Sequence, residues 1–252
     1  MSAAPTPGAT TYVLVHGAGH GGWCWRRVSD RLIARGHRVL TPTLTGLGER
    51  HHLLTERLSL DTFEADIINV IEAEELANVI LVGHSFAGIT ITGVAERMPE
   101  RLRHLVYLDA LIVPNGLSAF DMLPAEYAAR RRLQAQDSGS GASLPALDPR
   151  IFGITEPDDI AWLQRRLTPH PRATYEEKVR LRGHVGNGLP KTYVACTRPP
   201  FSNLVAVQRW VQTQSDWDWR EIAAGHDAMI TAPAELAEVL MDIGPADHGS
   251  AP

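Results

Sequence analysis

The sequence predicts an α/β protein with a doubly wound, mostly parallel sheet and an inserted cap. Short apolar runs alternate with helix-like stretches at both ends of the chain, as in parallel βα units. Between residues 111 and 190 this alternation stops. The 252 residues, 44% of them hydrophobic and 21% charged, suffice for one sizeable domain with an insertion. We therefore divide the chain into a first core part (1–110), an inserted cap (111–190) and a second core part (191–252).

Strands are expected where short apolar runs occur. Val79–Val82 is the clearest, because every residue in it is β-branched or leucine, as suits a strand covered on both faces. The other expected strands are Tyr12–His16, His37–Pro42, Leu102–Asp109, Thr192–Cys196 and Trp217–Ile222.

Helices are expected between these strands. Trp23–Arg35 is one, ended by Gly36, and another follows Val82 and continues to Pro99. Between them, Asp61 and Glu64 are interpreted as the capping pair of a helix. Its buried stripe would be Phe63, Ile67, Val70 and Ile71. The second core part adds a helix over Asn203–Gln212 and one from Pro233 with a stripe of Leu236, Val239, Leu240 and Ile243.

The cap is expected to contain several short helices over one end of the sheet. It also holds a link rich in glycine and serine, Gln136–Gly141, and a proline-rich turn, Thr168–Pro171. Some apolar cap side chains either line a substrate pocket or form the core of the cap, and the sequence leaves both options open for Phe120, Met122, Leu123 and Trp162.

Composition excludes several classes of function. A net charge of −5 and a pI near 6.1 argue against nucleic acid or an anionic membrane surface as a partner. No apolar run approaches the roughly 18 residues of a membrane span, and Met1–Thr10 has no signal-peptide pattern. Cys24 and Cys196 lie far apart and form no metal pattern. We expect a cytoplasmic protein without metal or cofactor.

One turn carries a candidate nucleophile. Gly83-His84-Ser85-Phe86-Ala87-Gly88 follows the clearest strand and precedes a helix, which is the setting of a nucleophile elbow. Its fifth position is Ala87 rather than glycine, so the motif is G-x-S-x-A-G. The alternative is an ordinary strand-to-helix turn that happens to contain a serine.

A glycine-rich loop follows the first strand, from His16 to Trp23. A phosphate-binding loop is disfavoured, because neither G-K-[ST] nor a spaced G-x-G-x-x-G is present. We interpret the loop as half of an oxyanion hole, in which the backbone N–H of Ala18 acts with that of Phe86. The neighbouring histidines His51 and His52 are interpreted as part of a surface loop, since no third ligand stands at metal spacing.

A serine nucleophile needs a base, and in this order of elements the acid and then the histidine follow the serine. His226 stands after the last expected strand, in Ala224-Gly225-His226-Asp227, and is the candidate base; a helix-capping or surface histidine is the alternative.

The acid requires a choice. The usual position after the penultimate strand is empty, because no Asp or Glu occurs between Lys178 and Ser215. Asp109 ends the strand next to the nucleophile strand and is our candidate, although it could instead only cap the following turn. Asp216 is the fallback, but it precedes a strand and so belongs to the wrong end of the sheet.

With these motifs the chain resembles α/β-hydrolase-fold esterases. The likeness is to the branch containing plant methyl-ester esterases, hydroxynitrile lyases and their bacterial esterase relatives, and the long Val15–Trp25 motif is its most specific part. The resemblance implies that Ser85 is the nucleophile and His226 the base, with Ala18 and Phe86 as oxyanion donors. It also implies a small-molecule ester substrate and a possible homodimer. Plant members carry the acid where this chain has Arg198-Pro199, which favours Asp109.

The lyases of this branch suggest a contrast. They have threonine at the position of Gly17 and lysine after the catalytic histidine, where this chain has Asp227. An acidic side chain beside the leaving group would oppose cyanide release. We therefore expect hydrolysis of a small or medium-sized, largely apolar carboxylic ester through an acyl-enzyme. A hydroxynitrile lyase and a hydrolase-fold binding protein are the alternatives.

Overall fold

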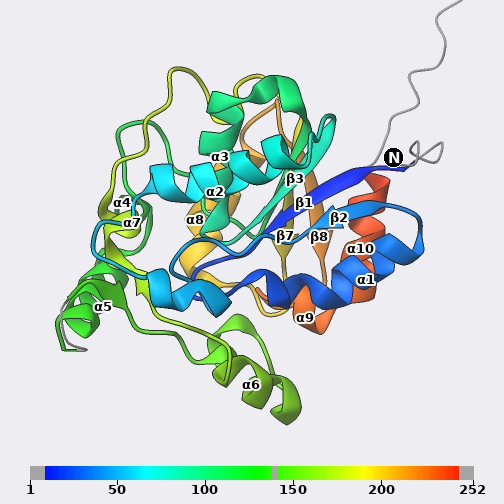
Figure 1. Cartoon of the computed structure of the whole chain (residues 1–252). Helices are drawn as coiled ribbons and strands as arrows, with labels where there is room; N and C mark the ends of the chain where they lie inside the picture. The colour runs from blue at the N-terminus through cyan, green and yellow to red at the C-terminus, as the bar shows by residue number, and fades with distance from the viewer. Residues whose placement is uncertain (1–8, 138–140, 244–252) are drawn as a thin grey trace, which may run out of the picture.

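A six-stranded, all-parallel sheet forms the centre of the computed structural model, which describes residues 9–137 and 141–243 (Figure 1). The strand order is β2-β1-β3-β4-β7-β8. The strand bounds are β1 Thr11–Val15, β2 Arg38–Leu40, β3 Val79–His84, β4 Leu102–Leu108, β7 Lys191–Cys196 and β8 Asp218–Ile222. The predicted doubly wound parallel sheet is confirmed, and each predicted strand is present with ends shifted by a few residues.

The order in which the chain adds strands to the sheet reverses between β1 and β3. The chain passes from β1 to β2 on one side and then crosses to β3 on the other side, with Val15 beside Gly83 in the register. The two loops that follow these strands, residues 16–21 and the turn around Ser85, therefore leave the same edge of the sheet next to one another. In open α/β sheets this is the position where ligands bind.

Helices cover both faces of the sheet (Figure 1). One face packs against α2 (Leu60–Ala73), α3 (Ala87–Arg97) and α8 (Val205–Gln212). The other packs against α1 (Arg26–Ala34), α9 (Ala228–Thr231) and α10 (Pro233–Asp242). Alternate strand residues serve the two cores, as the period of two in a strand requires. The strands are therefore apolar on both faces, which explains why their sequence is easy to recognise.

Two predicted helices begin with a 3₁₀ turn. The segments Gly22–Trp25 and Ser202–Leu204 precede α1 and α8, and further 3₁₀ turns cover Gly48–Leu53, Pro99–Arg101 and Pro149–Phe152.

The start of α2 differs from the prediction. Its capping box consists of Ser59 and Thr62. The Ser59 hydroxyl accepts a hydrogen bond from the Thr62 N–H at 3.3 Å, and the Thr62 hydroxyl accepts one from the Ser59 N–H. The proposed Asp61–Glu64 cap is wrong, because the helix begins one residue before Asp61. Glu64 instead lies against Gly93 of α3, where an added Cβ would meet its carboxylate.

The segment between β4 and β7 carries four short helices and a two-stranded antiparallel sheet, seen at the left and bottom of Figure 1. Their bounds are α4 Ala119–Met122, α5 Ala125–Asp137, β5 Ser143–Leu144, α6 Pro157–Gln164, β6 His170–Pro171 and α7 Arg172–Glu176. The predicted glycine- and serine-rich link at Gln136–Gly141 begins within a helix, since α5 extends to Asp137; residues 138–140 lie outside the described residues. None of the described helices is long and apolar enough to cross a membrane.

Candidate active site

Ser85 lies at the tip of the turn between β3 and α3. Its φ of 55° is in the left-handed region, which is uncommon for a residue with a side chain and typical of a strained functional turn. The turn is held by the Ser85 N–H donating to the Leu108 carbonyl at 3.1 Å and by the Leu111 N–H donating to the Ser85 carbonyl at 2.8 Å. A Cβ at Gly88 would lie 2.4 Å from the Leu111 carbonyl oxygen, so glycine is required there.

The structure brings Ser85, His226 and Asp109 into one chain of hydrogen bonds. The Ser85 hydroxyl lies 2.8 Å from His226 Nε2, and His226 Nδ1 lies 2.6 Å from Asp109 Oδ2. His226 and Asp109 are buried. With its Nδ1 proton directed at the carboxylate, the imidazole has a free Nε2 lone pair for the serine proton.

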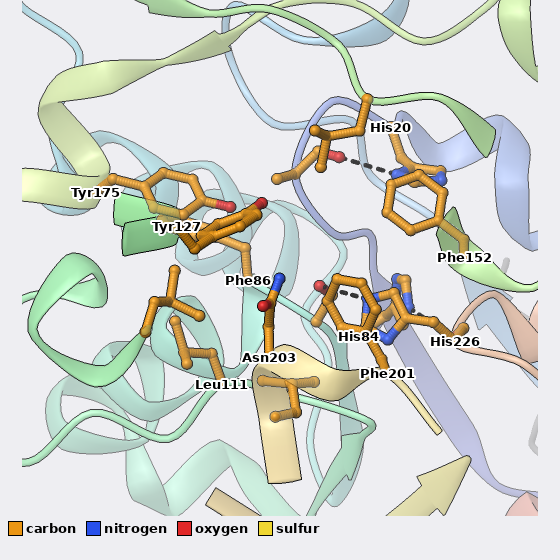
Figure 2. A pocket seen from close by; sticks show the side chains of 15 residues that line it. His20, His84, Phe86, Leu111, Tyr127, Phe152, Tyr175, Phe201, Asn203 and His226 are labelled. Carbon is orange, nitrogen blue, oxygen red and sulfur yellow. Dashed lines mark hydrogen bonds between the residues drawn. The ribbon is translucent and has the colours of Figure 1, made fainter. Parts of the chain in front are cut away.

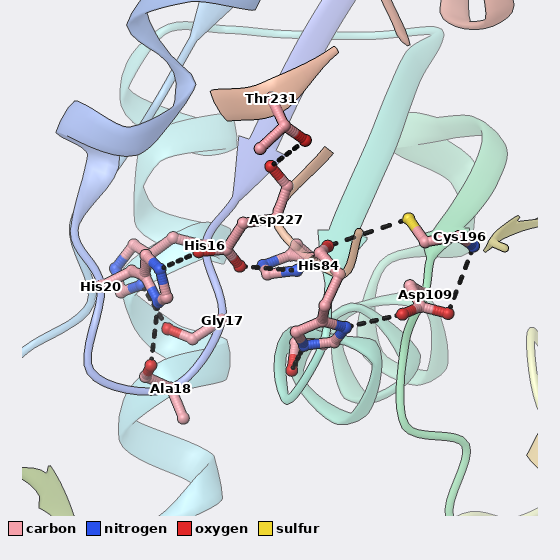
Figure 3. A network of polar contacts seen from close by, with 11 residues as sticks. His16, Gly17, Ala18, His20, His84, Asp109, Cys196, Asp227 and Thr231 are labelled. Atoms are coloured by element: carbon pink, nitrogen blue, oxygen red, sulfur yellow. Dashed lines mark hydrogen bonds and ion pairs between the residues drawn. The ribbon is translucent and has the colours of Figure 1, made fainter. Parts of the chain in front are cut away.

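Asp109 follows the last residue of β4 and has two further hydrogen-bond donors. Its Oδ1 accepts from Gln208 Nε2 at 2.7 Å and from the Cys196 N–H at 3.4 Å, as Figure 3 shows for Cys196. These bonds hold the carboxylate toward His226. Asp216 is not brought to the site, because it forms an ion pair with Lys191 Nζ at 2.6 Å at the opposite end of β7.

Two backbone N–H groups flank the serine. Ala18, in the loop after β1, and Phe86, which follows Ser85, both line the same cavity. Within residues 9–137 and 141–243, no acceptor receives a hydrogen bond from either N–H group. Phe86 is also the N-cap residue of α3, so the helix dipole adds positive potential at this point. The pair is therefore available to bind an oxyanion.

The serine opens into a small cavity lined mainly by aromatic rings and leucine side chains (Figure 2). Its wall combines residues from the strand ends with residues from the cap. The lining side chains around Ser85 and His226 are Ala18, His20, His84, Phe86, Leu111, Leu123, Tyr127, Leu147, Phe152, Tyr175, Phe201, Asn203 and Leu204.

Of the cap residues named from sequence, Leu123 lines the cavity and the other three do not. Phe120 packs with Ala128 in a small cap cluster, and Trp162 packs edge-on against Trp23 at 4.9 Å. Tyr127 and Tyr175 were missed because the apolar residues of α5 and α7 show no clear helical period.

Asn203 was also missed, although it follows a core strand. In the part of the chain that the structure describes, its amide has no hydrogen-bond partner, and Figure 2 shows it directed into the cavity. An unpartnered amide beside the serine is a group that a substrate could bind.

The sequence and the fold are similar to those of known hydrolases. The model of the alpha/beta hydrolase family matches residues 12–239. The protein is a member of the alpha/beta hydrolase family. A curated relative, the carbendazim hydrolyzing esterase of Nocardioides sp. (strain SG-4G), is 39% identical and aligns over 92% of this chain and 99% of its own length. Putative methylesterase 14 of Arabidopsis thaliana is 30% identical over 92% of this chain and 71% of its own.

Solved structures agree on the fold of this alpha/beta hydrolase. An extracellular alpha/beta-hydrolase from a Paenibacillus species superposes with a TM-score of 0.81 at 23% identity, covering 93% of this chain and 99% of its own. The methylesterase MES16 from Arabidopsis gives a TM-score of 0.76 at 20% identity over 93% and 98% of the two chains.

The imidazoles and carboxylates of the site already have protein partners. His84, His226 and Asp227 are close enough together to bind a metal ion, and no other such group is found among the described residues. However, His226 binds Ser85 and Asp109, and His84 Nε2 donates to the His226 carbonyl. Of the predicted surface pair, His51 and His52 are both exposed.

Asp227 does not lie where the lyase comparison requires it. Its carboxylate is fully buried and accepts a hydrogen bond from His20 Nε2 at 3.1 Å, and it does not line the cavity. Figure 3 shows it directed toward His20 and His84. The inference that it would oppose a leaving group is therefore wrong, because the turn sends the side chain beneath the site rather than into it.

Proposed function

We propose that this alpha/beta hydrolase is a cofactor-independent serine esterase that cleaves carboxylic esters of small or medium-sized, largely apolar substrates. The observation that carries the proposal is the hydrogen-bonded chain from Ser85 through His226 to Asp109 at the floor of an aromatic cavity. A serine hydroxyl becomes nucleophilic only with such a base in contact. The esterase names of the two curated relatives support the same reaction class.

The reaction proceeds in two halves. His226 takes the Ser85 proton as the oxygen attacks the ester carbonyl, and the Ala18 and Phe86 N–H groups bind the oxyanion. Collapse of the tetrahedral intermediate breaks the bond to the alcohol oxygen, to which His226 returns the proton. A water molecule then attacks the acyl-enzyme with His226 again as base, which releases the acid and regenerates the serine. Asp109 stabilises the imidazolium in both halves.

Two features support an ester substrate over a cyanohydrin. A Cβ at Gly17 would lie 2.9 Å from Ser85 Cβ, so the threonine that the resembling lyases carry could not be placed there without movement. No lysine or arginine lines the described cavity, so it lacks the lysine that holds the developing negative charge of the nitrile in the resembling lyases. A non-catalytic binding protein is disfavoured because Ser85 already contacts its base at 2.8 Å.

The wall of the cavity supports a substrate that is mainly apolar with one or two polar groups. Aromatic rings and four leucines line most of it, and Asn203 supplies an amide. Burial raises the pKa of Tyr175, so its phenol stays neutral near neutral pH. Carbendazim belongs in the first substrate panel, since the relative at 39% identity is named for hydrolysing it.

The test measures p-nitrophenyl butyrate hydrolysis by the wild type and by Ser85→Ala, Asp109→Asn and Asp216→Asn. We expect Ser85→Ala and Asp109→Asn to lower kcat by about 10⁴-fold or more. Asp216→Asn should stay near wild type, because Asp216 is remote from His226. Labelling of Ser85 by a fluorophosphonate, read by mass spectrometry, tests the acyl-enzyme separately. A wild type no faster than Ser85→Ala across the panel would overturn the proposal.

We also propose a cytoplasmic location and a homodimer. Cys24 and Cys196 are buried and unpaired, which suits a reducing compartment. Cell fractionation and light scattering of the purified protein test the two statements.

A further inference from the structure

A second buried pair of aspartate and histidine lies beside the proposed triad. His20, in the loop after β1, and Asp227, directly after His226, are 2% and 0% exposed, and Asp227 Oδ2 lies 3.1 Å from His20 Nε2. Neither residue is used by the mechanism above. A buried carboxylate is costly unless a partner compensates its charge, so the pair requires an explanation.

The hydrogen bonds of His20 define where its protons are. Nδ1 lies 3.0 Å from the Ala18 carbonyl oxygen, which can only accept, so Nδ1 carries a proton. Nε2 faces the Asp227 carboxylate at 3.1 Å. Both ring nitrogens thus point at acceptors, the arrangement that an imidazolium satisfies and a neutral imidazole does not unless Asp227 is itself protonated.

The second carboxylate oxygen of Asp227, Oδ1, faces His84. His84 Nε2 donates to the His226 carbonyl at 3.0 Å, so this nitrogen also carries a proton. The same nitrogen lies 3.6 Å from Asp227 Oδ1, too far for a hydrogen bond, and among the described residues this buried oxygen has no hydrogen-bond partner. His20 is therefore the hydrogen-bonded partner of the carboxylate, and the nearby His84 N–H adds a weaker electrostatic stabilisation of the anion.

The surrounding titratable groups add no competing charge. Burial lowers the pKa of His16 to about 3 and lowers the pKa of His84 well below its ordinary value, so both imidazoles stay neutral. Burial raises the pKa of Cys24, which stays a neutral thiol. The rings of Trp23 and Phe152 pack on the His20 ring, with centroid distances of 5.7 and 5.6 Å. Asp227 and His20 are thus left to neutralise one another.

The directions of the pKa shifts agree with this geometry. Burial alone would lower the pKa of His20, but the facing Asp227 carboxylate and the two hydrogen bonds outweigh it, and the pKa is raised. Burial alone would raise the pKa of Asp227, but the His20 charge and hydrogen bond outweigh it, and the pKa is lowered.

We propose that His20 is a positioning residue held as an imidazolium by Asp227. Through one ion pair it ties the oxyanion loop at Ala18 to the loop that carries His226, and His84 joins both to the elbow. Figure 3 shows these contacts as one connected network. The three parts of the machinery come from loops after β1, β3 and β8, and this network holds them in a fixed relation.

The kinetic consequence rests on the proposed esterase function. His20 has no hydrogen bond to Ser85 Oγ or the His226 ring that would place it in the proton transfers; it acts on the Ala18 peptide and, through Asp227, on the turn that carries His226. Loss of the charge should loosen the geometry that the transition state needs and lower kcat about tenfold, with KM changed less than about twofold. Asp227→Asn removes the charge at almost unchanged shape.

The charge itself is measured by NMR on ¹⁵N-histidine-labelled protein at pH 7.5, with His20→Gln used to assign the His20 signals. We expect protons on both His20 nitrogens in the wild type and on only one in Asp227→Asn. A wild-type His20 with a single protonated nitrogen would overturn the proposal, whatever the activity.

Kinetics of Asp227→Asn and His20→Gln on p-nitrophenyl butyrate test the positioning role. His52→Gln, an exposed histidine away from the cavity, is the matched control and should behave like wild type. An unchanged kcat in Asp227→Asn that has lost the His20 charge would overturn the positioning role. Should the wild type prove inactive as an esterase, the proposed function fails while the NMR result still decides the charge of His20.

Discussion

His226 Nδ1 lies 2.6 Å from Asp109 Oδ2, a carboxylate carried at the end of β4 rather than after β7. The acid thus comes from the strand adjacent to the one that carries Ser85. In a parallel sheet the ends of neighbouring strands are a strand spacing apart, so either position can reach the same imidazole. What the relocated acid needs is its own set of donors.

Gln208 is one of those donors, and its removal should weaken the triad. Gln208 Nε2 donates to Asp109 Oδ1 at 2.7 Å. Gln208→Leu removes a hydrogen bond to a buried charge, worth about 1.5–3 kcal/mol, and we expect kcat to fall about tenfold. Gln212→Leu, an exposed position on the same helix, is the control. Equal kcat values in the two variants would contradict a supporting role for Gln208.

Gly17 should tolerate no side chain. A Cβ there would lie 2.9 Å from both Ser85 Cβ and His84 Nδ1, so Gly17→Ala must displace the nucleophile or its neighbour. We expect kcat to fall about 10²-fold with the fold retained, measured by ester hydrolysis and circular dichroism. Gly183→Ala is the matched control, because nothing lies within 4 Å of the added methyl. Wild-type activity in Gly17→Ala would show that the elbow has room to move.

Asn203 should govern preference for polar acyl groups. Its amide lines the cavity without a partner in the described residues. Asn203→Leu should lower kcat/KM about tenfold for esters whose acyl chain carries a carbonyl or hydroxyl, and leave p-nitrophenyl butyrate within about threefold. A parallel loss on both substrate types would instead indicate a change in the position of Ser85.

Glu64 should make stability depend on pH. Burial against α3 raises its pKa to about 7, despite the Arg97 partner. At pH values between the pKa of Glu64 in the unfolded chain and about 7, the folded protein binds one proton more than the unfolded chain. The free energy of unfolding therefore falls as the pH rises through this range. Glu64→Gln should remove that fall and give a Tm roughly 3 °C above wild type at pH 8. Scanning calorimetry at pH 5 and pH 8 measures it, with the exposed Glu72→Gln as control. An identical pH dependence in Glu64→Gln and wild type would refute this.

The strands and the elbow were predictable because their sequence reports burial directly. A strand such as β3 is covered on both faces, so it must be apolar throughout, and the glycine spacing around Ser85 follows from close contacts that leave no room for a side chain. Asp109 was selected because the usual position of the acid is empty in the sequence. Its hydrogen bond to His226 is in the structure; its role in catalysis stays a proposal.

Other features depend on contacts that no local pattern contains. The direction of Asp227 is set by its pairing with His20, more than 200 residues earlier in the chain. The start of α2 was misplaced because Asp61 and Glu64 have the right chemistry two residues too late, while the capping box uses Ser59 and Thr62. Tyr127 and Tyr175 lie in short helices whose apolar residues face the cavity and the cap core together.

The reacting groups and part of the substrate-binding wall come from different segments of the chain, which affects how substrate preference can evolve. Ser85, Asp109 and His226 follow core strands, while Leu123, Tyr127, Leu147, Phe152 and Tyr175 reach the cavity from the segment inserted between β4 and β7. Mutations at Leu123, Tyr127, Leu147 and Tyr175 can reshape the wall that meets the substrate, whereas Phe152 also packs against the His226 ring and so helps to hold a reacting group. Part of the substrate-binding wall is thus encoded in a different stretch of the gene from the reacting groups, and a recombination event that exchanges this stretch can change substrate preference while the reaction stays the same.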